Sequence, residues 1–290
     1  MKIILSSNPY RDHGMRAAQQ AQKILEKEGV QCSFCLPFEI ESGSRPELPR
    51  HLRFTQLQQE LPDADLLICF GGDGTILHAA KDATRYNIPI LGVNMGSVGF
   101  MAELEERELS QVRRLAGGNY TIEERMMLQV TLVRGKQVVY DELALNDAVI
   151  SKGSIARVAE LDVAADGVNI CRLTGDGVVI ATPTGSTAYS MSAGGPIVEP
   201  NSDAMIVTPV CAHQLSARPM VMSAGRTITV RLPAKSRKSV YLSTDGGKSV
   251  RISGNDRVEI RTAECRTRLV RLTDKNFYQL LNQKLGGYAP

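Results

Sequence analysis

One carboxylate stands among three glycines at the end of an apolar run. Residues 66–70 are apolar throughout, and Gly71-Gly72-Asp73-Gly74-Thr75 follows directly, ahead of an amphipathic segment. A glycine-rich turn between a strand and a helix lets the backbone approach a ligand, and its N–H groups bind phosphate together with the helix N-terminus. The glycines therefore predict a phosphate site, and Thr75 is expected to cap the helix.

Asp73 is the unusual member of this turn. A carboxylate repels phosphate, so we expect one beside a phosphate site only where it takes part in the chemistry. Asp73 could hold a metal ion, or it could accept a proton from an attacking hydroxyl, as the catalytic Asp of protein kinases does. The alternative is an ordinary turn in which Asp73 is a local cap. The sequence contains neither a P-loop nor G-x-G-x-x-G, which excludes a P-loop NTPase and a standard dinucleotide-binding oxidoreductase.

The second half of the chain carries two further groups of polar residues. Asn146-Asp147 stands between apolar residues, and Asp176 lies in a Gly-Asp-Gly turn before the apolar run 178–181. The loop that follows, up to residue 200, is dense in Gly, Ser and Thr and contains Tyr189. Such a loop suits a ligand with sugar hydroxyls and an aromatic base, although it could also be a plain surface loop.

Composition restricts the class of protein. The 290 residues are 43% hydrophobic and 22% charged, with a net charge of +3 and no long basic tract. These values indicate a globular protein whose main partner is not nucleic acid. No apolar stretch has the length of a membrane helix, and the N-terminus does not resemble a signal peptide. We therefore expect a cytoplasmic protein without membrane partners.

Cysteine and histidine positions do not predict a metal site. Cys32 and Cys35 have the spacing of a redox or zinc pair, but no second pair follows, so we interpret them as core residues of a strand. The four histidines show no ligand spacing, and surface positions explain them better than zinc binding.

The first third of the chain alternates apolar runs with helical periodicity. Strands are predicted at 2–7, 30–36, 65–70 and 88–94, and helices at 13–28 and 75–86. Residues 37–64 suggest a loop with a short helix. Near-continuous apolar strands separated by helices indicate a parallel sheet that is covered on both faces.

After about residue 118 the pattern changes to short alternating strands. Hairpins are expected around Arg134-Gly135-Lys136 and Asp166-Gly167, and further strands at 227–233, 239–244, 249–253, 257–262 and 267–272. This pattern is typical of an antiparallel sandwich. A last amphipathic helix is predicted at 275–285.

Several of these segments, taken in order, resemble the NAD kinases. They are GGDGT (71–75), LGVNMGSVGFMAEL (91–104), ALNDAVI (144–150), GDGVVIATPTGSTAYSMSAGGPIVEP (175–200) and LSARPMVM (215–222). Variants of GGDG also occur in phosphofructokinases and in diacylglycerol and sphingosine kinases, so that motif alone is weakly specific. The segment TPTGSTAYSMSAGGP is far more specific, and the match covers most of the chain.

The resemblance implies an α/β plus all-β fold with the active site in the cleft between two domains. An N-terminal, Rossmann-like parallel-sheet domain (1–117) precedes an antiparallel β-sandwich (118–274), and a C-terminal helix (275–290) returns to the first domain. The implied reaction transfers the γ-phosphate of ATP, or a phosphate of polyphosphate, to the 2′-hydroxyl of the adenosine ribose of NAD, forming NADP. Mg²⁺ or another divalent cation and a homodimer or homotetramer are implied as well.

The resemblance also implies roles for individual residues. Asp73 would be the general base, and Gly74 would lie against NAD. Asn146 and Asp147 match the Asn-Glu pair with which the family holds the dinucleotide. The other implied ligand-binding residues are Gly71, Gly72, Thr75, Arg157, Thr174, Asp176, Thr187, Ala188, Tyr189, Ser190 and Ser192.

Two departures from the family pattern stand out. Asp147 is one methylene shorter than the usual Glu, and Gly247 stands where many relatives have Gln. Two alternative functions are a lipid or sugar kinase that shares the GGDGT turn, and a nucleotide sensor without catalysis. A lipid kinase should show an apolar entry stretch, and a sensor should have lost Asp73.

Overall fold

The computed structural model describes residues 1–38, 40, 46–96, 99–154, 157–233 and 239–286. The chain divides into two compact units, one of residues 1–124 and 267–290 and the other of residues 125–266. Two long strands, β7 (Thr121–Arg134) and β18 (Asp256–Arg271), belong in part to each unit. The domain limits inferred from the sequence, at 117/118 and 274/275, stay predictions.

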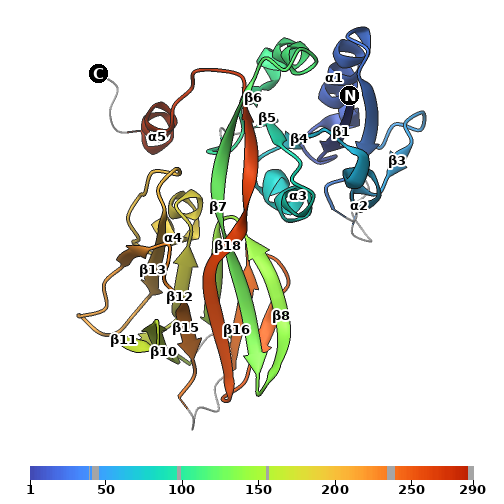
Figure 1. Ribbon diagram of the computed structural model, residues 1–290. Coiled ribbons are helices and arrows are strands. Elements are labelled where there is room, and N and C mark those ends of the chain that lie inside the picture. Colours follow the sequence, from blue (N-terminus) through green and yellow to red (C-terminus); the bar gives the residue numbers. More distant parts are fainter. Residues whose placement is uncertain (39, 41–45, 97–98, 155–156, 234–238, 287–290) are drawn as a thin grey trace. The chain divides into compact units, whose positions relative to one another are not determined.

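A parallel sheet forms the first unit (Figure 1). Its strands lie in the order β3-β2-β1-β4-β5. Their bounds are β1 Lys2–Ser7, β2 Gln31–Cys35, β3 Phe54–Thr55, β4 Leu66–Gly71 and β5 Ile90–Asn94. The end of β18 and the short β6 (Leu104–Glu105) also pair with β5. Strands β4 and β5 are buried along their whole length, which explains their continuous apolar sequence.

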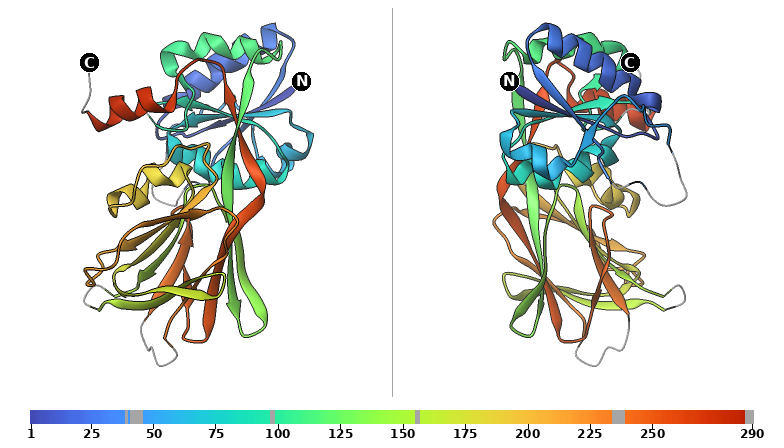
Figure 2. Two further views of the ribbon diagram at one scale, coloured as in Figure 1. Left: turned by 60° about the vertical axis from the view of Figure 1, so that its left-hand side comes forward. Right: turned by 90° about the vertical axis from the view of Figure 1, so that its right-hand side faces the viewer.

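Helices cover both faces of this sheet (Figure 2). α1 (Arg16–Lys27) and the 3₁₀ helix η3 (Glu106–Leu115) lie side by side on one face, and α3 (Asp73–Arg85) lies on the other. Shorter helices are η1 (His13–Met15), α2 (Leu57–Glu60) and η2 (Leu61–Asp63). From β1 the chain adds β2 and β3 on one side of the sheet and then β4 and β5 on the other side. Ligands of open α/β sheets bind at such a switch point, outside the carboxyl ends of the strands.

The last helix, α5 (Phe277–Leu285), belongs to the first unit. Asn276 and Gln279 form a reciprocal capping box at its start, and Gly286 ends it with φ of 63°. The Phe277 ring lies 6.1 Å from the Phe100 ring, and the Lys284 ammonium lies 4.4 Å from the centre of the same ring. Residues 287–290 of the predicted C-terminal segment fall outside the described residues.

The second unit contains two antiparallel sheets whose inner faces share one apolar core. One sheet has the order β11-β10-β15-β18, and the hairpin of β7 and β8 joins it at β18. The other has the order β14-β13-β12-β9-β16-β17. The bounds are β8 Gln137–Ala144, β9 Asp147–Lys152, β10 Ala159–Ala165, β11 Val168–Gly175, β12 Gly177–Ala181, β13 Ala204–Val210, β14 Met220–Ser223, β15 Ile228–Arg231, β16 Val240–Thr244 and β17 Val250–Ile252.

One strand prediction was wrong in this unit. The separate strands expected at 257–262 and 267–272 are a single strand, β18. The four residues between them, 263–266, include no Gly, Pro, Asn or Asp, so nothing in the local sequence turns the chain. The predicted polar loop before residue 200 also contains two short helices, η4 (Thr184–Thr187) and α4 (Tyr189–Ser192).

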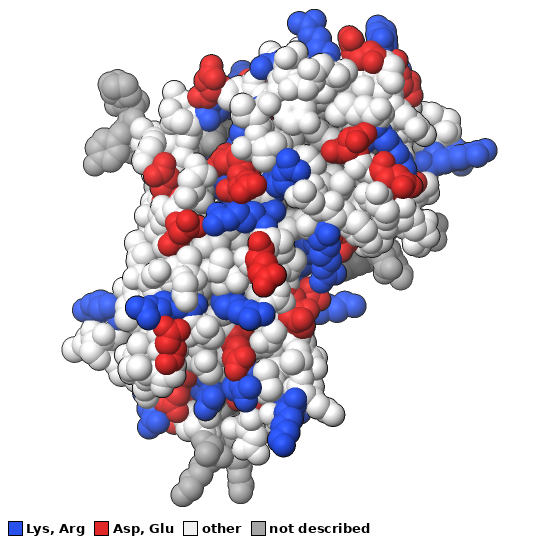
Figure 3. All heavy atoms as spheres, viewed as in Figure 1, with Lys and Arg blue, Asp and Glu red and all other residues white. Residues whose placement is uncertain are grey.

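The surface shows no large field of one charge on the face drawn in Figure 3, where acidic and basic side chains alternate over short distances. Within the described part of the chain, none of the helices combines the length and the apolar character that a membrane crossing requires.

Candidate active site

The glycines of the turn between β4 and α3 have two different roles. A Cβ atom on Gly71 would lie 2.1 Å from Thr75 Oγ1, whereas one on Gly72 or Gly74 would have nothing within 4 Å. Gly71 is therefore required by packing inside the turn. Gly72 and Gly74 instead leave open space beside the N-terminus of α3, where a phosphate group can approach the backbone N–H groups.

Thr75 does not cap the helix, so that expectation was wrong. α3 begins at Asp73 with Gly72 as N-cap residue, and no side chain among the described residues caps it. Thr75 is 3% exposed and sits under Gly71, and its hydroxyl accepts a hydrogen bond from Asn8 Nδ2 at 3.4 Å. Thr75 thus ties the end of β4 to the chain that follows β1.

The Asp73 carboxylate is held by two backbone N–H groups. Phe100 N–H donates to Oδ2 at 2.8 Å, and Met101 N–H donates to Oδ1 at 3.1 Å. A Cβ atom on Gly99 would lie 2.0 Å from Asp73 Oδ1, so only glycine allows this approach. Asp73 is half-buried, and its carboxylate is thereby fixed in one orientation at the N-terminus of α3.

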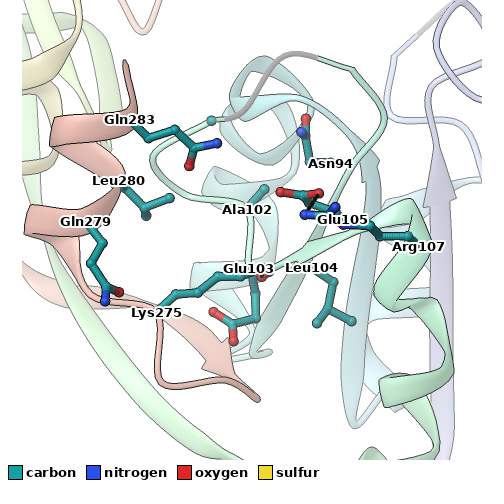
Figure 4. A pocket seen from close by; sticks show the side chains of 11 residues that line it. Asn94, Ala102, Glu103, Leu104, Glu105, Arg107, Lys275, Gln279, Leu280 and Gln283 are labelled. Atoms are coloured by element: carbon teal, nitrogen blue, oxygen red, sulfur yellow. Dashed lines mark hydrogen bonds and ion pairs between the residues drawn. The ribbon is translucent and has the colours of Figure 1, made fainter. Parts of the chain in front are cut away.

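The segment that holds Asp73 is itself anchored by Glu103. This 2% exposed carboxylate accepts hydrogen bonds from Leu272 N–H at 2.9 Å and from the Thr273 N–H and hydroxyl, both at 2.6 Å, and pairs with Arg271 at 3.1 Å. Figure 4 shows Glu103 and Lys275 beside a cavity of about 230 Å³ that Gln279, Leu280 and Gln283 of α5 also line. Residues 99–104 therefore have little freedom to move away from Asp73.

In the second unit, Asp245 holds the backbone of the Asn146-Asp147 pair. Its carboxylate accepts hydrogen bonds from three successive N–H groups, those of Leu145 at 2.8 Å, Asn146 at 2.8 Å and Asp147 at 3.0 Å. Asp245 has φ of 51°, a left-handed conformation that Asp tolerates better than most residues. The arrangement orients both side chains of the pair at the start of β9.

The loop after β12 holds the same pair from another side. Thr182 N–H donates to the Asn146 carbonyl at 2.9 Å, and the Thr182 hydroxyl donates to the Leu145 carbonyl at 2.5 Å. A Cβ atom on Gly185 would lie 2.0 Å from the Asn146 carbonyl oxygen, so glycine is required there. Asn146 is thus enclosed by segments that lie far apart in the sequence.

Asp176 lies at the other end of the same strands. Gly177 pairs with Ser151 and Ala181 with Asp147 in the antiparallel register of β12 and β9, so Asp176 and Asp147 are separated by about five residues of strand, or roughly 16 Å. The Asp176 carboxylate pairs with Lys152 Nζ at 2.6 Å. A single small ligand cannot touch both Asp147 and Asp176, but a dinucleotide can.

Two other predicted site residues are Thr174 and Arg157. Thr174 lies at the end of β11 and donates its N–H to Gln214. Arg157 is exposed.

The predicted loop residues 187–192 divide between the surface and the interior. Tyr189 is 44% exposed, and Ser192 lies on the same exposed side of the short helix α4. Thr187 and Ala188 are half-buried, and the Thr187 hydroxyl donates to the Thr184 carbonyl. Ser190 instead points inward, where its fully buried hydroxyl lies 2.8 Å from the Thr208 hydroxyl, so we assign Ser190 a structural role.

Burial gives Asp147 an unusual acidity. It is 5% exposed, and loss of solvation together with the neighbouring Asp245 carboxylate raises the pKa of Asp147 to about 7. Close to neutral pH this side chain therefore exists in both forms, and it can accept or donate a hydrogen bond. The shorter acid at this position thus lies in a pocket that disfavours its charge.

We expect this acidity to appear in the stability of the protein. A carboxyl group whose pKa is higher in the folded than in the unfolded chain stabilises the fold at low pH, and that stabilisation is lost as pH rises to the folded pKa. Relative to an Asp147→Asn variant, the free energy of unfolding should fall between about pH 4 and pH 7 by at most about 1.4 kcal/mol per pH unit. Urea titrations at pH 5, 6, 7 and 8 measure this. Parallel pH profiles for the two proteins would contradict it.

Cys32 and Cys35 have raised pKa values, and the described residues contain no cluster of metal ligands. Burial raises the pKa of Cys32 to about 12 and that of Cys35 to about 11, so neither is a reactive thiolate. Over the described ranges of the chain, three or more His, Cys, Asp or Glu side chains do not cluster in a way that could hold a metal ion.

Sequence reasoning missed two features of these sites. Asp245 was overlooked, although Asp245-Gly246-Gly247 is a clear turn signal and an Asp in a turn commonly binds backbone N–H groups. The contact of Asp73 with the backbone of Phe100 and Met101 had no sequence signal, because backbone groups look alike in a sequence.

Comparisons with known proteins identify the family to which the chain belongs. Residues 6–117 match the ATP-NAD kinase N-terminal domain, and residues 145–272 match the ATP-NAD kinase C-terminal domain. The NAD kinase of Geobacter metallireducens is 42% identical over 81% of this chain and 84% of that protein. The NAD kinase of Ruminiclostridium cellulolyticum is 36% identical over 98% of this chain and 97% of that protein.

Solved structures show the same fold. A yeast NADH kinase complexed with NADH has a TM-score of 0.84 and 26% identity, covering 100% of this chain and 89% of that one. An NAD kinase from Archaeoglobus fulgidus in complex with ATP has a TM-score of 0.76 and 24% identity, with both chains covered completely. The sequence relatives and the two domain matches together show that this chain belongs to the NAD kinase family, enzymes that use ATP to form NADP from NAD.

Proposed function

We propose that Asp73 is the general base that activates the 2′-hydroxyl of the adenosine ribose of NAD for attack on the γ-phosphate of ATP. The observation that carries this proposal is the pair of hydrogen bonds from Phe100 N–H and Met101 N–H to the Asp73 carboxylate. A carboxylate offers about four acceptor sites. Two are used by the backbone, so acceptor sites remain for a substrate hydroxyl.

The donor phosphates are proposed to lie beside Gly72 and Gly74, where open space adjoins the N-terminus of α3. Phosphoryl transfer needs positioned reactants and compensation of negative charge more than covalent chemistry. A divalent cation bound to the ATP phosphates would compensate negative charge beside Asp73, which stands between Gly72 and Gly74. The positive end of the α3 helix dipole also offsets part of the repulsion between Asp73 and phosphate.

The dinucleotide is proposed to be held by the second unit. Asn146 and Asp147, fixed by Asp245, would bind one part of NAD, while Asp176 and the exposed Tyr189 would bind another. Arg157, Thr174, Thr187, Ala188 and Ser192 remain proposed members of this site. We likewise propose that residues 1–117 together with 275–290 bind the phosphate donor, and that residues 118–274 bind NAD.

One assay tests the proposed function directly. Purified protein is incubated with NAD and Mg²⁺ together with ATP or polyphosphate, and NADP formation is read with an NADP-specific dehydrogenase. NADP should form with ATP and should depend on the divalent cation. A protein that binds NAD and ATP but forms no NADP would contradict the proposal. AMP should be a far poorer acceptor than NAD, because it lacks half of the proposed anchoring contacts.

Tyr189 and Asp176 provide a prediction about NAD binding. Tyr189→Ala should weaken the binding of NAD by a factor on the order of ten, since base stacking on an aromatic side chain contributes roughly 1–3 kcal/mol. Asp176→Ala should weaken it comparably through loss of hydrogen bonds to a charged group. Calorimetry measures both, with Tyr86→Ala, a similarly exposed tyrosine at 47%, as the control. Unchanged NAD affinity in both variants would remove these residues from the site.

Two broader features also remain proposals. All six cysteines are free thiols, which supports an enzyme of the reducing cytoplasm. Assembly into a homodimer or homotetramer is supported by the family resemblance, and sedimentation at several protein concentrations tests it. The family match replaces the lipid or sugar kinase alternative, and the retained Asp73 argues against a sensor without catalysis.

A further inference from the structure

A cavity of about 410 Å³ lies at the same edge of the parallel sheet as the glycine turn. Leu36, Pro37 and Phe38 line it directly after β2, and Gln56 lines it directly after β3. Carboxyl ends of parallel strands meet at one edge, so this cavity and the turn after β4 open on the same side of the sheet. The volume is within the range of small-ligand sites.

Helix α3 connects the two places along one of its sides, where Gly74 and His78 are exposed and Asp82 is half-buried. Gly74, His78 and Asp82 stand four residues apart and therefore lie on one side of the helix. With a rise of about 1.5 Å per residue, His78 is about 6 Å and Asp82 about 12 Å along the helix axis from Gly74. Gly74 borders the proposed phosphate position, and His78 and Asp82 line the cavity. A ligand with phosphates at one end and a ring at the other can follow this side of the helix.

The cavity wall has the character of a base-binding site. The Phe38 ring lies 5.5 Å from the His78 ring and is stacked on Tyr10, at 6.1 Å with 11° between the planes. Phe54 and the buried Leu57 add further apolar surface. At the rim, the Asp82 carboxylate accepts a hydrogen bond from Gln58 at 2.8 Å. Flat aromatic walls with a few polar groups at the edge suit a purine, whose exocyclic amine can donate to a carboxylate.

We propose that this cavity, bounded by Phe38, His78 and Asp82, binds the adenine ring of the phosphate donor. The inference rests on the proposed function, which puts the donor phosphates beside Gly72 and Gly74. It assigns the donor as an adenine nucleotide rather than polyphosphate, because a chain of phosphates has no ring to fill an aromatic cavity. The acceptor NAD is not expected to use it.

The experiment compares two donors that share phosphates but differ in the base. Calorimetry measures the binding of ATP and of inorganic tripolyphosphate, each with Mg²⁺, to the parent protein and to Phe38→Ala and His78→Ala. His51→Ala is the matched control, because His51 is also an exposed histidine of the first unit but pairs with Gln19 and does not line the cavity. His78 is exposed on a helix, so alanine there should not disturb folding.

ATP should bind Phe38→Ala on the order of tenfold more weakly than the parent, and His78→Ala by a smaller factor, while tripolyphosphate binding stays within twofold. In NADP formation the KM for ATP should rise, and the KM for NAD should not. Unchanged ATP binding in both variants, an equal loss of tripolyphosphate binding, or a parent that binds tripolyphosphate as tightly as ATP would overturn the inference. A parent that binds ATP through this cavity yet forms no NADP would instead refute the proposed function alone.

Discussion

Replacing Asp73 by Asn should lower kcat for NADP formation by a factor on the order of 10²–10⁴, the usual cost of losing a general base. The amide keeps the size of the side chain but cannot accept the proton of the ribose hydroxyl. The N–H groups of Phe100 and Met101 bind different oxygens of the carboxylate, and the amide replaces one of these oxygens with an NH₂ group that cannot accept a hydrogen bond. NAD affinity, measured by calorimetry, should stay within a few fold of the parent.

Two further variants test whether the position of the carboxylate matters and whether the loss of activity is specific to the Asp73 site. Gly99→Ala keeps the Asp73 carboxylate but displaces it, because the new Cβ would lie 2.0 Å from Oδ1. A misplacement of about 1 Å costs roughly 10²-fold in rate, so this variant should lose most of its activity as well. Asp63→Asn, an exposed position in the same unit, is the control and should leave kcat unchanged. Near-normal turnover of Asp73→Asn would rule out the assignment of Asp73 as general base.

Replacing Asp245 by Gly should reduce kcat/KM for NAD by a factor on the order of 10²–10³. The carboxylate accepts three N–H hydrogen bonds from residues 145–147, and hydrogen bonds to a charged group contribute about 1.5–3 kcal/mol each, without strict additivity. Glycine adopts the left-handed conformation of Asp245 without strain. The loss should therefore reflect a disordered Asn146-Asp147 pair, and ATP binding should not change.

The matched control for this prediction is Asp166→Gly. Asp166 also has a left-handed conformation, with φ of 48°, and also binds a backbone N–H group of its own unit, that of Thr227 at 2.9 Å. It lies in the hairpin between β10 and β11, so its loss should leave NAD kinetics unaltered. Asp245→Asn, which keeps one acceptor oxygen, should give an intermediate value. Equal NAD kinetics for Asp245→Gly and Asp166→Gly would show that Asp245 does not position the NAD-binding pair.

The periodicity of apolar and polar residues was sufficient to predict the fold class. The apolar runs at 2–7 and 65–70 became β1 and β4, and the periodic segment at 13–28 contains α1. The change to alternating strands after residue 118 indicated an antiparallel region, and the second unit has that character. Local sequence carries such information because strand and helix periodicity follows directly from which side of each element is buried.

By itself, the sequence determined that Asp73 follows a buried strand in a glycine turn and that the motifs around it are those of NAD kinases. Only the tertiary structure decided what each of these residues touches. Gly71 serves packing against Thr75, Ser190 turns inward to Thr208, and Asp245 lies against residues about 100 positions earlier in the chain. The physical reason is that a side chain's hydrogen-bond partners depend on chain segments brought together by folding, and their backbone N–H groups carry no mark in the sequence.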